Sequence, residues 1–458
     1  MSKVRSMDMV NGPLLGKILR FSVPLMLSGM LQFLYNAADV IVVGKFAGAA
    51  SLAAVGSTGA LVNLLVNLFM GVSVGCNVLV ARYYGARNEK AVSETVHCAV
   101  AASAVIGLLA GAVGLILSTP LLRLMGSPED VLPLASLYLK IYFCGMPFNI
   151  AYNFGAAVLR AVGDTRRPLY ILSATGAVNV ALNLLTVIVF FMGVAGVALA
   201  TAASQLISCL LVLRCLTLRD DCCRLVRKEI RIYGDKLKEM IRIGLPAGIQ
   251  SSLFSLSNVV IQSSINSFGS TVVAGNAAAA NIEGFVYISM NAIYQACITF
   301  VSQNLGAGKP DRIRRVMRIC LCAVTVIGGV LGMTVFLLHH PLLGIYASDA
   351  EGLREQIIAV GHTRLLYIGV VYFLCGWMEV AAGGLRGLGR SWLPTSIALL
   401  GSCLFRIVWI NTVFRSVRTL DMIYISYPIS WTVTFAAHLI FFLIALHGLQ
   451  RRLPKQAA

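Results

Sequence analysis

The amino-acid sequence predicts an all-α integral membrane protein with twelve transmembrane helices in two pseudo-symmetric lobes of six. Three observations lead to this fold class: a strongly apolar composition, repeated apolar runs of spanning length, and short motifs that recur in the same order in both halves. Of the 458 residues, 58% are hydrophobic and only 12% are charged, whereas soluble domains carry about 25% charged residues. Runs of about 20 apolar residues are long enough to cross a bilayer.

The individual helices are predicted from the apolar runs and from the polar or glycine-containing breaks between them. The expected spans are 17–43, 52–81, 92–117, 131–159, 168–192 and 194–216 in the first half, and 241–267, 272–304, 315–338, 357–385, 393–416 and 422–449 in the second. The count of twelve depends on two breaks, at Gly193 and around Gly269, which lie at matching places in the two halves.

The two halves contain the same short motifs in the same order. Residues 159–163 read Leu-Arg-Ala-Val-Gly and residues 385–389 read Leu-Arg-Gly-Leu-Gly, and Pro168 and Pro394 follow at the same distance. Six spans per half is an even number, so both halves enter the membrane in the same orientation and the repeat is parallel. Such internal repeats are typical of secondary transporters.

The predicted domains follow from this repeat. They are a first six-helix lobe at residues 1–216, a cytoplasmic inter-lobe linker at 217–240, and a second six-helix lobe at 241–458. The linker sequence is compatible with an amphipathic helix on the inner membrane surface and equally with a solvated connection.

The net charge of +18 indicates how the protein is oriented in the membrane and does not indicate a nucleic-acid partner. Most of the 37 Lys and Arg residues lie in short loops that alternate along the chain, with no basic stripe and no nucleic-acid motif. Positively charged loops remain on the cytoplasmic side of a membrane. We therefore expect a multi-pass protein of the cell membrane with both termini in the cytoplasm.

Ionisable residues inside the predicted spans are candidate functional residues, because charges in a bilayer are costly. Asp39 lies in the first span, Glu283 in the eighth, Glu379 in the tenth and Arg406 in the eleventh. Arg406 is a possible partner for either second-lobe acid. Together with Asn153 in the fourth span, Glu283, Glu379 and Arg406 are candidates for a substrate cavity or a second-lobe coupling site.

Amide and hydroxyl side chains are expected to converge on Asp39. Asn36 precedes it by one helical turn, and Asn179 and Asn183 are four residues apart on one helix face. Thr201 in the sixth span completes the set. These groups would form an oxygen-lined pocket suited to a hard cation or a proton relay, although such residues also simply hold membrane helices together.

These motifs resemble the multidrug and toxic compound extrusion (MATE) family, in particular its bacterial, Firmicutes-type branch. The motifs that show the resemblance most clearly are Asn-Ala-Ala-Asp-Val-Ile-Val-Val-Gly at 36–44, Tyr-Gly-Ala at 84–86 and Gln-Asn-Leu-Gly-Ala-Gly at 303–308. The resemblance implies two six-helix lobes around a central V-shaped cavity. It also implies a first-lobe cation site at Asp39, Asn179 and Thr201, with Asn183 departing from the aspartate expected there.

The expected function is secondary active export of amphipathic, preferably cationic, organic molecules by proton- or sodium-coupled antiport. No nucleotide-binding or catalytic motif is present, so we expect neither an enzyme nor a cofactor, only a coupling ion, proton or sodium. The alternative is a flippase for a lipid-linked precursor. It would need a basic cavity, for which the spans offer only Arg406, Arg364 and Lys140. The expected partners are a small organic substrate and the lipid bilayer, with the protein acting as a monomer.

Overall fold

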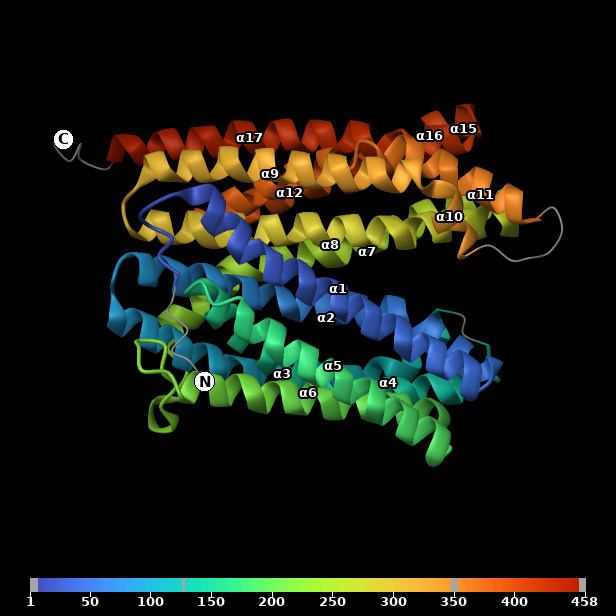
Figure 1. Ribbon diagram of the computed structural model, residues 1–458, viewed down its shortest axis with the longest axis horizontal. Coiled ribbons are helices and arrows are strands. Elements are labelled where there is room, and N and C mark those ends of the chain that lie inside the picture. Colours follow the sequence, from blue (N-terminus) through green and yellow to red (C-terminus); the bar gives the residue numbers. More distant parts are fainter. Residues whose placement is uncertain (1–6, 126–127, 347–352, 453–458) are drawn as a thin grey trace. The chain divides into compact units, whose positions relative to one another are not determined.

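The computed structural model describes residues 7–125, 128–346 and 353–452, and within these ranges it contains helices and no strands (Figure 1). The helices are α1 (Leu14–Phe46), α2 (Ala49–Gly85), α3 (Glu89–Leu124), α4 (Leu132–Ala161), α5 (Arg166–Leu184), η1 (Leu185–Val189), α6 (Gly193–Thr217), η2 (Arg227–Glu229), α7 (Gly234–Asn266), α8 (Ser270–Gly306), α9 (Pro310–Leu337), α10 (His339–Gly344), α11 (Leu353–Arg364), η3 (Leu365–Gly369), α12 (Phe373–Gly387), α13 (Trp392–Ala398), η4 (Leu399–Leu404), α14 (Phe405–Asn411), α15 (Val413–Ser416), α16 (Leu420–Tyr424) and α17 (Ser426–Arg452).

The predicted all-helical membrane fold is confirmed. Each predicted span corresponds to one helix or to a run of helices joined by π-helical turns or short breaks. Among the described residues, nine helices are long and apolar enough to cross a membrane, and a tenth span forms if Leu353–Gly369 and Phe373–Gly387, bent by 42°, count as one. The remaining two predicted spans correspond to α4 and α7, which have 30 and 33 residues.

The internal repeat is visible in the backbone. Residues with positive φ occupy matching places: Gly48 and Gly269, Arg87 and Gly308, Gly163 and Gly389. At Gly163 and Gly389 the φ angles are 88° and 80°, and both residues turn the chain directly after the Leu-Arg motif. This left-handed conformation favours glycine because it has no Cβ.

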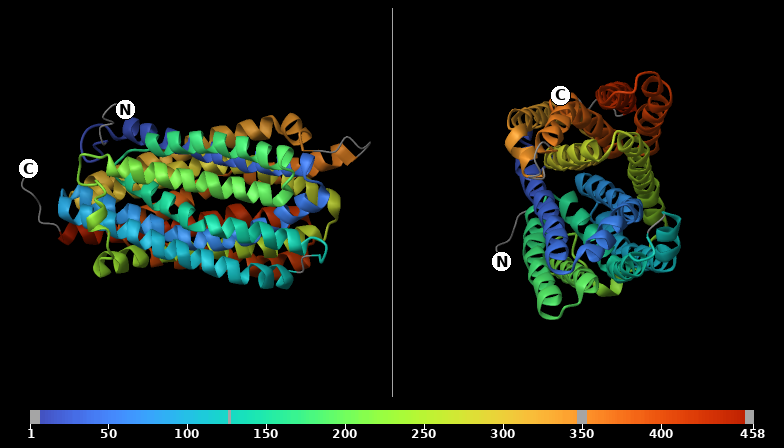
Figure 2. Two further views of the ribbon diagram at one scale, coloured as in Figure 1. Left: turned by 90° about the horizontal axis from the view of Figure 1, so that it is seen from below. Right: turned by 90° about the vertical axis from the view of Figure 1, so that its right-hand side faces the viewer.

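The chain forms two compact units whose bounds fall inside α1 and α7. One unit contains Leu27–Ser252, and the other contains Met9–Met26 and the chain from Leu253 onward. The domain bounds predicted from the sequence lie elsewhere, at the two ends of the linker at 217–240. In both views of Figure 2 the long helices within each unit run roughly along one direction.

The same packing pattern is used in each unit. In the first unit α4 packs against α2, α3 and α6, and in the second α12 packs against α8, α9 and α17. The α3–α4 contact depends on glycines, because a Cβ on Gly107 would lie 2.6 Å from Cα of Pro147 and one on Gly114 would lie 2.1 Å from the Phe143 ring. Small residues let membrane helices approach this closely.

The linker after α6 is fastened to the first unit. Its only helical turn is η2, and the backbone N–H of Val226 donates to Nε2 of His97 in α3 at 2.9 Å. Arg219, 5% exposed, pairs with Asp221 and lies 3.8 Å from Asp164. Burial acts to raise the pKa of Asp221, but the hydrogen bonds and positive charge of Arg219, the backbone N–H of Cys223 and the charge of Arg167 together hold that pKa below its usual value.

Candidate functional site

The first unit contains a chain of hydrogen-bonded polar side chains from α1, α5 and α6. The Nδ2 amide of Asn183 donates to Oδ1 of Asp39 and also lies 3.3 Å from Oδ1 of Asn179. The amide of Asn179 in turn reaches Oγ of Ser204 at 3.4 Å. Asn183 thus contacts Asp39 directly and Asn179 is connected to it only through Asn183, since four residues along α5 bring both amides to one face.

Two buried oxygens of the predicted site residues lack a hydrogen-bond partner in the part of the protein that the structure describes. They are Oδ1 of Asn183 and Oγ1 of Thr201. Ser204 donates to the backbone carbonyl of Thr201 at 2.8 Å. Thr201 is therefore connected to the hydrogen-bonded side chains through its backbone and not through its hydroxyl. Unsatisfied buried polar atoms cost about 1–3 kcal/mol each. Together with the carboxylate of Asp39, these oxygens supply the donor type that Na⁺ or a proton-carrying site requires.

Two other predicted residues of the first lobe stand apart from this chain. Asn36 is exposed, and the described residues record no hydrogen bond between it and Asp39. Asn153 donates to the carbonyl oxygen and the Oδ1 of Asn149, both at 2.8 Å, within α4. Sequence reasoning missed Ser204, although its position three residues after Thr201 places it on the same face of α6.

In the second unit Glu283 is held in a buried ion pair with Arg364. Nη2 of Arg364 lies 2.7 Å from Oε2 of Glu283, and its Nη1 donates to Oδ1 of Asn276 at 2.7 Å. The hydroxyl of Tyr424 donates to the same Asn276 oxygen at 3.3 Å. Glu283 is 3% exposed and Arg364 is 9% exposed. Breaking a buried pair of this kind destabilises the fold, because removing one partner leaves the other charge uncompensated.

This pairing corrects the expectation that Arg406 could neutralise Glu283. Arg364 takes that role because α11 packs directly against α8, which carries Glu283. Arg406 instead donates from Nε to Oγ of Ser430 at 2.9 Å, and its guanidinium carbon lies 4.0 Å from the ring centre of Tyr427. A desolvated cation–π contact contributes about 2 kcal/mol, less than the several kcal/mol that burying a charge costs.

Glu379 has a different environment. It is half-buried on α12, and no hydrogen bond or ion pair is recorded for it among the described residues. Its carboxylate interacts electrostatically with Arg386, a buried arginine seven residues further along α12, and not with Arg406.

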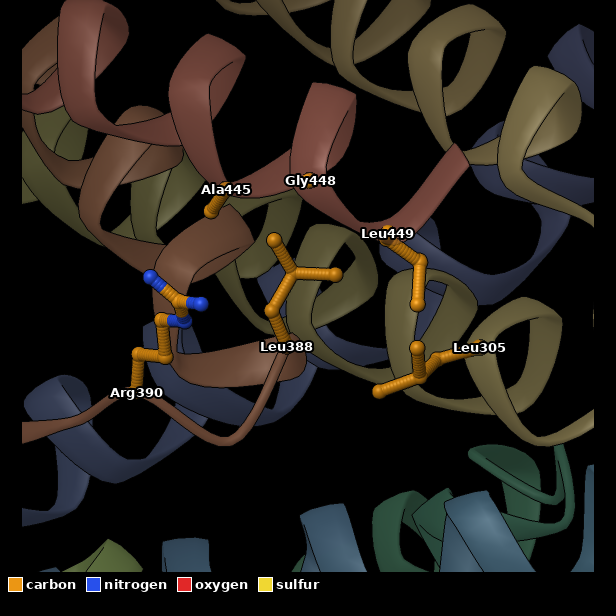
Figure 3. Close-up of a pocket in the computed structure, with 6 residues that line it drawn as sticks. All are labelled: Leu305, Leu388, Arg390, Ala445, Gly448 and Leu449. Carbon is orange, nitrogen blue, oxygen red and sulfur yellow. The ribbon is translucent and has the colours of Figure 1, made fainter. Parts of the chain in front are cut away.

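A hollow of about 150 Å³ lies at the ends of α8, α12 and α17. Its lining, drawn in Figure 3, is Leu305, Leu388, Arg390, Ala445, Gly448 and Leu449. None of the candidate residues belongs to this lining, so the hollow is separate from the polar side chains described above.

Long apolar helices, a duplicated helix arrangement and buried polar side chains define a multi-pass helical membrane protein built from two similar units. The sequence profile of the MatE family matches residues 24–185 and 246–410, one match in each half. The chain belongs to the MatE family, as the resemblance predicted.

Relatives and solved structures agree with this assignment. The chain is 29% identical to "Probable multidrug resistance protein YoeA" of Bacillus subtilis, over 83% of this chain and 82% of the relative. It is 22% identical to "Multidrug export protein MepA" of Staphylococcus saprophyticus, over 80% and 82% of the two chains. A solved structure described as an outward-facing MATE family transporter superimposes with a TM-score of 0.89 at 21% identity, covering 98% of this chain and 100% of the other.

Proposed function

We propose that this protein is a secondary active transporter that exports amphipathic organic molecules by proton- or sodium-coupled antiport. The observation that carries the proposal is the series of hydrogen-bonded side chains in the first unit, in which Asp39 accepts from Asn183 and the amide oxygen of Asn183 has no partner among the described residues. Its relatives named as multidrug export and multidrug resistance proteins support the direction and substrate class.

Asp39 is the proposed coupling group. Its Oδ1 accepts the hydrogen bond from Asn183, whereas no partner is recorded for Oδ2 in the described part of the chain. A proton would bind at Oδ2. A sodium ion would take the same carboxylate together with Oδ1 of Asn183 or Oγ1 of Thr201, the two oxygens that no hydrogen bond satisfies. Binding of the ion and of the substrate would alternate, so that the ion gradient drives export.

The proposed substrates include lipophilic cations. Glu283 is already neutralised by Arg364, so a cationic substrate would meet Glu379, where it would compete with Arg386. The flippase alternative is weaker, because one of its three candidate basic residues, Arg364, is occupied by Glu283, and the remaining two, Arg406 and Lys140, are few for a pyrophosphate. We further propose that the protein acts as a monomer in the cell membrane and needs no cofactor besides the coupling ion.

The test is transport in proteoliposomes with independently imposed proton and sodium gradients and a panel of cationic dyes. Asp39→Asn should abolish gradient-driven export while keeping the melting temperature close to that of the wild type, because Asn can still accept the amide hydrogen bond of Asn183. Asp130→Asn, an exposed acid of the same unit, is the matched control. Wild-type export by Asp39→Asn would remove the first-unit site from the mechanism.

A further inference from the structure

Arg406 is a buried cation for which the described residues offer no anionic partner. It is 3% exposed, and its Nη2 has no hydrogen-bond partner within the described ranges. Across the described ranges, no Asp or Glu forms an ion pair with it, and its one recorded hydrogen bond, from Nε, goes to the neutral Ser430. Arg364 in the same unit shows the contrast, because its guanidinium binds both Glu283 and Asn276.

Aromatic rings surround this guanidinium. Tyr427 lies 4.0 Å and Trp431 5.6 Å from its central carbon, measured to the ring centres. Tyr372 extends the wall, with its ring centre 5.4 Å from that of Trp431. These rings provide flat apolar faces and leave the positive charge formally uncompensated.

The helix that carries Arg406 is irregular on both sides. The π-helical turn η4 (Leu399–Leu404) precedes α14, and the helix breaks after Asn411 at Thr412. π-helical turns inside helices are frequent at functional sites. Because Nη2 is buried in this structure, a ligand could reach it only if α14 moved between these two irregularities.

We propose that Arg406 binds the negatively charged group of the transported molecule, a carboxylate or sulfonate attached to an aromatic ring system. A planar guanidinium with a free N–H edge matches a carboxylate in geometry and charge, and the Tyr372, Tyr427 and Trp431 rings match an aromatic body. The inference rests on the proposed transport function and deepens it, because it names the residue that would recognise the anionic group of a substrate.

The test compares two dyes with the same xanthene core and opposite charge, carboxyfluorescein and rhodamine 123. Their affinities for the purified full-length protein in lipid nanodiscs are measured by fluorescence polarisation. Arg406→Gln should weaken carboxyfluorescein binding by about tenfold or more, the effect of losing a charge-assisted hydrogen bond, and leave rhodamine 123 binding within about twofold. Arg415→Gln, which removes an exposed arginine nine residues further along, should change neither affinity.

Arg406→Lys keeps the test informative if Arg406→Gln does not fold. It retains the charge but loses the planar fork, so carboxyfluorescein binding should fall by less than in Arg406→Gln while rhodamine 123 binding is kept. The proposal is overturned if the wild type does not bind carboxyfluorescein, if its affinity is unchanged in the Arg406 variants, or if both dyes lose affinity equally together with the melting temperature. Gradient-driven export of rhodamine 123 is measured separately, so failure of the transport proposal remains distinguishable from failure of the Arg406 site.

Discussion

Position 183 decides how many carboxylates the first-unit site contains. The Asn183 amide donates to Asp39 and to Asn179, and its own oxygen remains without a partner. An aspartate at this position would place a second carboxylate against Asp39. With asparagine, the site has one group that can carry a proton.

Asn183→Asp should therefore change the coupling chemistry without destroying the fold. Two carboxylates in contact share a proton or capture a cation between them. We expect the pH profile of transport to shift upward, or a dependence on sodium to appear, in proteoliposome assays with imposed gradients. Asn88→Asp, at the exposed N-cap of α3, serves as the control. Identical pH and sodium profiles for wild type and Asn183→Asp would direct the search for coupling to Glu379.

Glu283 should matter for stability because it neutralises Arg364. Glu283→Gln leaves the buried guanidinium without its counter-charge, and breaking such a pair costs about 3–5 kcal/mol. We expect a clearly lower melting temperature and a lower free energy of unfolding in mixed micelles. Glu355→Gln on α11, which is exposed, is the control. Equal stability of the two variants would show that the ion pair is not formed in the folded protein.

At the scale of elements, the π-helical turns lie beside the buried polar residues. η1 (Leu185–Val189) begins two residues after Asn183, η3 (Leu365–Gly369) begins directly after Arg364, and η4 ends two residues before Arg406. π-helical turns inside α-helices are frequent at functional sites. Only η4 precedes the polar residue beside it, so among the three only Arg406 has its direction changed by the turn.

The packing of α9 against η3 gives a test at this scale. A Cβ on Gly332 would lie 2.3 Å from the carbonyl oxygen of Gly369, whereas one on Gly329 in the same helix would meet nothing within 4 Å. Gly332→Ala should destabilise the protein by about 1–3 kcal/mol, because a backbone atom has to move. Gly329→Ala should be neutral or slightly stabilising, since alanine favours helix more than glycine. Thermal unfolding of both variants measures the difference, and equal melting temperatures would contradict the close approach.

At the scale of the whole molecule, the parallel repeat predicts the membrane topology. In a cysteine-free background, single cysteines at Asn88 and Lys309 should react with an impermeant maleimide only from the cytoplasm. A cysteine at Ser416 should react only from outside. Asn88 and Lys309 follow the second helix of each half, which is why they are expected on the same side. Outside labelling at position 309 would imply an odd number of spans before it and would refute the parallel arrangement.

The sequence by itself determined the fold class, the helices and the repeat. Apolar runs of spanning length and the glycine breaks at Gly193 and Gly269 are local features, and local features fix where a membrane helix begins and ends. The spacing of Asn179 and Asn183 also placed both amides on one helix face, whereas the contact of Asn183 with Asp39 depends on how α5 packs.

The tertiary structure decided which distant charges meet. Glu283, Arg364 and Arg406 lie in separate helices, and the sequence could not predict that Arg364 reaches Glu283 while Arg406 lies over Tyr427. Ion pairs between distant segments depend on which helices pack together and on the π-helical turns that redirect side chains, and neither is encoded in a local pattern. The charge left over by that pairing, on Arg406, is the feature that only the folded chain reveals.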